Sequence, residues 1–335
     1  MSDFFVSIIT CTYNPSEEVF YRVLRAIAQL NRTGIETEYV IIDNNSKQPV
    51  ASLSYVAAFL KENSWARVVV ENEPGLTAAR ICGYTNTRHE ALLFVDDDVE
   101  LAADYLQNIA SLFKNYPQVG AWNAGSIEVD YIEKPEAWFL TKGKAYFQQS
   151  AIQENCWGNS RVPAPYTPFG TGLCITRDAF TLYAEKVKNK EYNLTDRVGG
   201  KMSSGGDSQM VLCAIALNYN VGRSPFLKLH HLVSPAKATV DYLVNLSFGL
   251  AYSFQIFKKE AVPEAYKPLN QFCSIAKVII HNTLHLPPGF DFKSYRAVIA
   301  DRLGIALADY RMQNRKTPAW LKMSFFIFGI KTKGY

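Results

Sequence analysis

Three consecutive aspartates, Asp96, Asp97 and Asp98, are the strongest chemical signal in the sequence. Adjacent carboxylates repel one another unless a cation or hydrogen-bond donors compensate. In an extended segment, residues i and i+2 point the same way, so Asp96 and Asp98 can converge on one cation. Carboxylate oxygens suit Mg²⁺ or Mn²⁺, which also take phosphate oxygens as ligands. The triplet therefore predicts a divalent-metal site, unless it is only the acidic start of a helix from Leu101.

Three further charged residues allow two interpretations each. Asp43, at the end of an expected strand, either forms a turn or accepts hydrogen bonds from a nucleotide base or ribose. Arg80 is either a solvated surface residue or a partner for a diphosphate, whose geometry a guanidinium matches. Asp207 follows the stretch 203–206 and is either the N-cap of a helix near Ser208 or a base that faces the substrate.

Histidines and tryptophans supply weaker candidates. Paired residues such as His230 and His231 are usually packing or surface residues, but one neutral imidazole can complete a metal shell. Trp138 and Trp157 are either partly buried or platforms for the C–H face of an acceptor sugar.

Strands and helices are expected to alternate over the first third of the chain. Short apolar, β-branched runs predict strands at 4–11, 39–42, 67–70 and 91–95, and helical spacing of apolar residues predicts helices at 19–30, 50–60 and 101–113, with a short one after Gly75. This order predicts an α/β fold with a mostly parallel sheet between helices. The polar clusters 12–14, 43–46 and 96–98 all follow strands, which predicts one shared site at the carboxyl ends.

The pattern changes after the fourth predicted strand. Residues 126–170 are aromatic and irregular, which is typical of a functional loop region. A strand is expected at 173–176, and a glycine-rich stretch, 199–206, precedes a helix at 210–217. From Thr239 the pattern is helical, so we expect a catalytic domain at 1–235 and a basic, mostly helical region at 236–335.

Composition narrows the class of protein. Hydrophobic residues make up 48% and charged residues 20%, which excludes a disordered or fibrous chain. No apolar run approaches the ~18 residues of a membrane-spanning helix, and the N-terminus does not resemble a signal peptide. The six cysteines form no CxxC pair, so we expect a reducing cytoplasmic location. We expect no nucleic-acid partner.

Positive charge is confined to the C-terminal quarter. Residues 261–335 carry 11 Lys or Arg against 4 Asp or Glu, whereas residues 1–260 carry 24 against 27. Four aromatic residues lie among four lysines near the end: Trp320, Phe325, Phe326 and Phe328 with Lys316, Lys322, Lys331 and Lys333. This segment is either a packed terminal helix or a peripheral contact with the inner face of the cell membrane.

Taken in order, these segments resemble a family 2 glycosyltransferase of the GT-A fold. The resemblance covers residues 4–255 and is carried by SIITCTYN at 7–14, VIIDNNS at 40–46, ENEPGLTAARICGY at 71–84, LLFVDDDVEL at 92–101, FGTGLCITRDAF at 169–180, GGDSQM at 205–210 and HHLVSPAKAT at 230–239.

The resemblance implies an inverting transferase that uses a nucleoside-diphosphate-sugar donor (UDP-, GDP- or dTDP-linked) and Mn²⁺ or Mg²⁺. It implies nucleotide-sugar contacts at Thr12, Tyr13, Asn14, Asp43, Arg80, Asp96 and Asp97. Asp98, Asp96 and His231 would hold the metal, and Asp207 would be the catalytic base. The acceptor is expected to be a glycan or lipid-linked glycan of cell-surface polysaccharide synthesis.

The chain departs from the family pattern around the expected base. Gly206 stands where the family often has Glu, Gln209 where it often has an acid, and Ile81 where it usually has Asn. A non-catalytic glycan-binding or scaffold protein is therefore one alternative, and a sugar nucleotidylyltransferase is another. The second class usually has a glycine-rich, basic loop after its first strand, where this chain has Thr12, Tyr13, Asn14 and Pro15.

Overall fold

The computed structural model describes residues 4–193, 196–198, 201–266, 268, 291–332 and 335. These residues form two compact units, of which the first comprises residues 1–191 and 206–235 and the second residues 192–205 and 236–335. Gly199 and Gly200 of the glycine-rich stretch, Lys333, and Cys273, which is one of the six cysteines, lie outside the described part.

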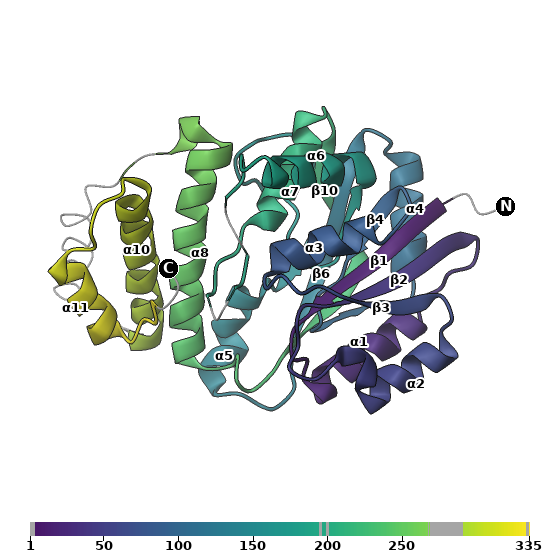
Figure 1. Cartoon of the computed structure of the whole chain (residues 1–335), viewed down its shortest axis with the longest axis horizontal. Coiled ribbons are helices and arrows are strands. Elements are labelled where there is room, and N and C mark those ends of the chain that lie inside the picture. Colours follow the sequence, from purple (N-terminus) through teal and green to yellow (C-terminus); the bar gives the residue numbers. More distant parts are fainter. Residues whose placement is uncertain (1–3, 194–195, 199–200, 267, 269–290, 333–334) are drawn as a thin grey trace. The chain divides into compact units, whose positions relative to one another are not determined.

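The first unit contains one sheet of ten strands in the order β3-β2-β1-β4-β9-β6-β10-β5, with β7 and β8 paired at its side (Figure 1). Four parallel strands form one half: β1 (Phe4–Thr12), β2 (Ile35–Asp43), β3 (Ala66–Val70) and β4 (Ala91–Phe94). The other half mixes directions, because β9 (Leu173–Thr176) runs antiparallel to both β4 and β6 (Val119–Tyr131). There, β10 (Asn220–Val233) is parallel to β6, and β5 (Val99–Leu101) is antiparallel to β10.

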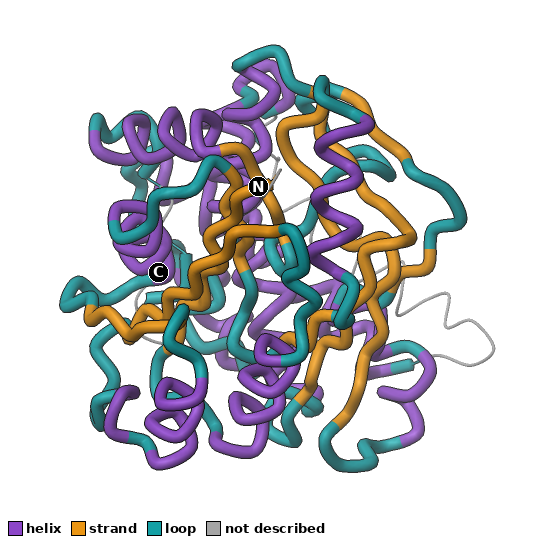
Figure 2. Tube along the Cα trace, turned by 90° about the vertical axis from the view of Figure 1, so that its right-hand side faces the viewer, coloured by secondary structure: helices purple, strands orange, loops and turns teal. Residues whose placement is uncertain are grey.

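Helices cover both faces of this sheet, and Figure 2 shows them on either side of the orange strands. One face packs against α1 (Glu17–Ala28), α2 (Ser54–Glu62) and α4 (Tyr105–Asn115). The other carries α3 (Leu76–Thr85) and α6 (Arg177–Lys188), and α7 (Gly206–Ala216) lies beside α6. The approach of α3 is close, since a Cβ on Gly83 would come within 2.5 Å of the Ile9 Cγ2 atom.

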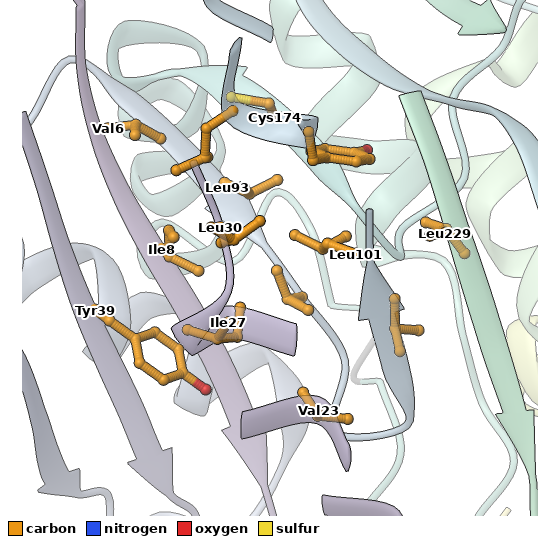
Figure 3. Close-up of a cluster of buried hydrophobic side chains, with 14 of the residues drawn as sticks. Val6, Ile8, Val23, Ile27, Leu30, Tyr39, Leu93, Leu101, Cys174 and Leu229 are labelled. Atoms are coloured by element: carbon orange, nitrogen blue, oxygen red, sulfur yellow. The ribbon is translucent and has the colours of Figure 1, made fainter. Parts of the chain in front are cut away.

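The two-residue repeat of a strand assigns its side chains to these two faces. On β1, Val6 and Ile8 point into the core under α1 and α4, where Figure 3 shows Val23, Ile27 and Leu93 around them. On the opposite face, the Phe94 ring stacks on Phe180 of α6 at a centroid distance of 5.1 Å. Burial on both faces explains why β1 and β4 read as continuous apolar runs.

Two predicted helix starts differ from the structure. The helix expected from Leu101 begins at Tyr105, because Val99–Leu101 form β5 and pair with β10. The acid triplet therefore precedes a strand, and its interpretation as a helix start is wrong. The helix expected at 210–217 spans Gly206–Ala216, so Asp207 lies within its first turn rather than at its N-cap.

The irregular region contains short elements. After β6 come α5 (Ala137–Thr141), a 3₁₀ helix (Gly143–Phe147), β7 (Ser150–Ala151) and β8 (Cys156–Gly158). A 3₁₀ turn (Val50–Ser52) also precedes α2, where the sequence predicted one continuous helix.

The second unit is helical in its described part. It contains α8 (Val240–Ala261), a 3₁₀ turn (Pro263–Ala265), α10 (Phe292–Met312) and α11 (Ala319–Phe328). Hydroxyl Oγ1 of Thr239 caps α8 by accepting a hydrogen bond from the Tyr242 amide at 3.2 Å. No helix within the described residues has both the length and the apolar character needed to cross a membrane.

Truncation of a central core side chain should destabilise the first unit. Leu93 of β4 is fully buried, so we expect Leu93→Ala to lower the free energy of unfolding by about 2–5 kcal/mol. The measurement is urea denaturation followed by tryptophan fluorescence. Val70→Ala on edge strand β3 is the control, since Val70 is 55% exposed and should change stability by less than about 0.5 kcal/mol. Equal losses for both variants would contradict this assignment of the core.

Candidate active site

The carboxyl ends of β1, β2 and β4 bring the first candidates together. Thr12 pairs with Asp43 in the register of β1 and β2. The pairing of β1 with β4 ends at Ile9 and Phe94, and three residues further along each chain lie Thr12 and Asp97. Hydroxyl Oγ1 of Thr12 donates a hydrogen bond of 2.5 Å to Oδ2 of Asp97. Strand order reverses between β1 and β4, where α/β sheets bind ligands.

The acid triplet is a turn and not an extended segment. The amide of Val99 donates to the carbonyl oxygen of Asp96 at 3.2 Å, which closes a four-residue turn. The premise that Asp96 and Asp98 align as i and i+2 of a strand is therefore wrong, and Asp96 as a metal ligand stays a prediction.

His231 lies beside the last aspartate of the triplet. It pairs with Val99 across β10 and β5, and its Nε2 atom is 3.7 Å from Oδ2 of Asp98. Its Nδ1 atom is 3.0 Å from the carbonyl oxygen of Phe147. A carbonyl can only accept, so Nδ1 carries the proton in this contact. Nε2 is then the ring atom that a metal beside Asp98 could bind. The neighbouring His230 is exposed, so His231 is the histidine at the site.

A tight segment before β9 brings Asp207 to the same edge. β9 runs antiparallel to β4 and pairs Leu173 with Phe94, so the segment Gly170–Gly172 precedes β9 at the edge where β4 ends. A Cβ on Gly170 would lie 3.0 Å from Oδ2 of Asp207. The Asp207 carboxylate also accepts a hydrogen bond from the Ser208 amide at 2.9 Å. Asp207 therefore lies directly against the glycine segment at the carboxyl edge.

Buried hydrogen bonds hold this glycine segment in place. Oη of Tyr105 donates to the carbonyl oxygen of Gly172 at 2.6 Å, and Nδ2 of Asn123 donates to the carbonyl oxygen of Thr171 at 2.5 Å. Gly172 has φ +68°, a left-handed conformation that favours glycine. Sequence reasoning missed the roles of Tyr105 and Asn123, because both partners are backbone oxygens far along the chain.

Asp43 organises the loop that follows β2. Its Oδ1 atom accepts from the Ser46 amide at 3.0 Å, and its Oδ2 atom accepts from the Val50 amide at 2.8 Å. The turn-forming interpretation is thus correct for this carboxylate. Each oxygen keeps a second lone pair, so a contact with a nucleotide stays a prediction.

Two asparagines tie the neighbouring loops together. Asn44 accepts from the Gly75 amide at 2.8 Å and donates to the Glu73 carbonyl at 2.7 Å. Asn14, with φ 49°, accepts from the Lys47 amide at 2.9 Å. Tyr13 is 59% exposed, so its ring lies at the surface of this loop cluster. These hydrogen bonds hold together the loops after β1, β2 and β3.

Arg80 is buried, and its charge acts on the same thiol, that of Cys11, as the charge of Asp96. Arg80 is only 5% exposed, so the interpretation as a solvated surface residue is wrong. Burial raises the pKa of the Cys11 thiol to about 12, the positive charge of Arg80 opposes that rise, and Asp96 adds to it. A pKa in that range keeps the thiol protonated at neutral pH.

An ion-pair network that the sequence did not reveal supports the strand after the triplet. The Arg22 guanidinium of α1 donates to both carboxylate oxygens of Glu100 at 2.8 and 2.7 Å and to Asp130 at 2.7 Å. Hydrogen bonds to these carboxylates raise the pKa of Arg22 further. The fork-like contact connects α1, β5 and β6 directly behind Asp98.

The two tryptophan candidates lie in different places. Trp138 of α5 is half-buried and packs near Tyr146 with ring centroids 6.3 Å apart. Trp157 of β8 pairs with Gly222, nine residues before His231 on β10, which is up to about 30 Å of extended strand. Its ring packs 4.8 Å from that of Tyr116. The structure does not bring Trp157 to the other candidates.

Among the residues that the structure describes, no three His, Cys, Asp or Glu side chains are grouped closely enough to hold a metal by themselves. A metal at this edge would therefore take Asp98 and His231 together with ligands from outside the protein. Such sparse coordination is typical of Mg²⁺ or Mn²⁺ bound with substrate phosphates.

Comparison with known proteins agrees with this arrangement. Residues 7–166 match the model of the family described as Glycosyl transferase family 2. The mannosyltransferase PcManGT from Pyrobaculum calidifontis, solved in complex with GDP-Man and Mn²⁺, aligns with a TM-score of 0.54 and 17% identity, over 93% of this chain and 88% of that chain. TarS 1–349 from S. aureus aligns with a TM-score of 0.46 and 12% identity, over 93% of each chain. Among curated proteins, none matches the chain.

The family match runs from β1 to the loop after β8 and includes the acid triplet, whereas Asp207 and His231 lie beyond it. The likeness to PcManGT extends over 93% of this chain and shows its fold. The chain is thus a glycosyltransferase of the GT-A fold whose residues 7–166 match family 2.

Proposed function

We propose that this enzyme transfers a sugar from a nucleoside-diphosphate-sugar to a hydroxyl group of a glycan or lipid-linked glycan, with inversion at the anomeric carbon. The observation that carries the proposal is the meeting of Thr12, the acid triplet, His231 and Asp207 at one edge of the sheet. A role in cell-surface polysaccharide synthesis is the corresponding biological proposal.

The donor nucleotide would bind over the loops after β1, β2 and β3. Tyr13 offers an exposed ring and Asp43 a carboxylate with spare acceptor capacity, as a base and a ribose require. Thr12, Asn14, Asp96 and Asp97 complete the proposed contacts, and the Arg80 charge suits the diphosphate. PcManGT, which shares the fold, was solved with GDP-Man, which supports a donor of this class.

A divalent metal fits the residues present. Asp98 supplies a carboxylate oxygen, and the hydrogen bond to Phe147 leaves Nε2 of His231 as an acceptor that faces it. A backbone partner on the other ring nitrogen is how metal-binding histidines are usually oriented. When bound, Mn²⁺ or Mg²⁺ would neutralise charge on the departing diphosphate. Asp96 is the third proposed ligand, and its side chain would have to turn towards the metal, because the three do not form a group as they stand.

Asp207 would act as the general base. In one displacement the acceptor hydroxyl forms a bond to the anomeric carbon, the bond from that carbon to the diphosphate oxygen breaks, and the hydroxyl proton passes to the Asp207 carboxylate. The nucleoside diphosphate leaves with the bonding pair, so atoms and charge balance. Direct attack opposite the leaving group inverts the anomeric configuration. Trp138 remains the candidate platform for the acceptor sugar.

Removing the Asp98 charge should weaken metal-dependent nucleotide binding. We expect Asp98→Asn to raise the Kd for UDP or GDP by at least about tenfold in Mn²⁺, since the neutral amide is a poorer ligand. Calorimetry of whichever diphosphate the wild-type binds provides the measurement, with EDTA as the metal-free reference. Glu128→Gln on β6 is the matched control, because Glu128 is exposed. Unchanged affinity in Asp98→Asn would refute its role.

Removing the base should instead slow turnover while donor binding is kept. We expect Asp207→Asn to lower kcat by about 10² to 10⁴-fold with little change in donor Kd. The assay is release of nucleoside diphosphate from the UDP-, GDP- or dTDP-sugar that most stabilises the wild-type protein with Mn²⁺. If the protein were a non-catalytic scaffold, the wild-type protein itself would release no nucleoside diphosphate.

A matched control separates base catalysis from helix stabilisation. Asp178 occupies the first turn of α6 as Asp207 does in α7, and it likewise accepts from the next amide, at 2.8 Å. Asp178→Asn should therefore leave kcat nearly unchanged. Equal losses of kcat in the two variants, or equal losses of donor binding and turnover in Asp207→Asn, would count against the base.

A further inference from the structure

The terminal helix α11 has one buried side and one exposed apolar side. Leu321 is fully buried and Phe325 is 6% exposed, whereas Met323, Phe326 and Ile327 are 61%, 85% and 65% exposed. The exposed three stand at positions i, i+3 and i+4, which lie next to one another on a helix. Scattered exposed apolar residues are ordinary, but an adjoining set on one face marks a contact surface.

The buried side fixes this orientation within the second unit. The Phe325 ring packs edge-on against that of Phe248 of α8, with ring centroids 5.5 Å apart. The ring centroids of Phe328 and of Tyr295 of α10 lie 6.5 Å apart. At its end, Gly329 has φ +68° and caps the helix. Turning the exposed face inward would remove Leu321 and Phe325 from their core, so the helix presents Met323, Phe326 and Ile327 outward.

The charge of the chain segment that contains this helix is of one sign. Residues 310–335 contain six Lys or Arg and no Asp or Glu. Lys316, Lys322 and Lys331 are exposed, and Lys322 belongs to α11 itself. A second copy of the chain would bring the same positive charge to this face, which disfavours self-association through it. A negatively charged apolar surface is the complementary partner.

We propose that the exposed face of α11 binds the surface of an anionic lipid bilayer. Phe326, Ile327 and Met323 enter the boundary between headgroups and acyl chains, and the surrounding lysines contact lipid phosphates. Two terms contribute to the free energy of membrane binding: the burial of apolar area and the attraction between cations and anionic headgroups. This inference is independent of the transfer reaction, since none of these residues lies in the proposed active site.

Sedimentation of the full chain with lipid vesicles tests the proposal. We expect the wild-type protein to sediment at low salt with vesicles of phosphatidylcholine and phosphatidylglycerol, and to stay in the supernatant with phosphatidylcholine alone. Phe326→Ser/Ile327→Ser should weaken binding by at least about tenfold. Lys316→Gln/Lys322→Gln should weaken it by about fivefold for each lysine.

The matched control is Phe226→Ser on β10 of the first unit, because Phe226 is also exposed, at 58%. It should sediment as the wild-type protein does. Equal binding of wild-type and Phe326→Ser/Ile327→Ser, or a wild-type chain that ignores anionic vesicles, would overturn the proposal. So would a wild-type dimer that the double substitution converts to monomers, because that result would assign the face to a second copy. Nucleotide binding measured in parallel reports the active site separately.

Discussion

The active-site edge depends on the pairing of the short strand β5 with β10. Only three residues, Val99–Leu101, make this antiparallel contact, yet it places His231 against Val99 and so beside Asp98. β10 reaches that position because it pairs in parallel with β6, on the side of β6 that faces away from β9. The contact between Arg22 and Glu100 holds β5 from the side of α1. Two residues far apart in sequence, Asp98 and His231, thereby come within 3.7 Å of each other.

Much of the first half of the fold follows from the sequence, because local signals there agree with one another. The strands predicted at 4–11, 67–70, 91–95 and 173–176 are all present, and their apolar runs fit burial on both faces. Thr12, Asp43 and Asp97 could be grouped because each follows a parallel strand, and such strands end at one edge. That reasoning needs only chain order and strand direction, both of which periodicity reveals.

The remaining features depend on long-range pairing, which periodicity cannot show. Val99 and Leu101 fit a helix start or a strand equally well, and only their contact with β10 decides between them. Trp157 belongs to an aromatic-rich region without a clear period, and its pairing with Gly222 takes it away from the acid triplet. The sequence left Arg80 open between a surface residue and a diphosphate partner, because one arginine on a short helix gives no sign of its burial.

The segment Gly170–Gly172 is the reason to propose more for Asp207 than stabilisation of a helix. An acid in a first helical turn needs only solvent around it to interact with the helix dipole. Here the chain instead places Gly170 against the carboxylate, where a Cβ would approach Oδ2 to 3.0 Å. Tyr105 and Asn123 hold the two residues that follow it. Asp178, which has the same helical position in α6, is exposed. Such close support is what a carboxylate needs if it must meet a substrate in one orientation.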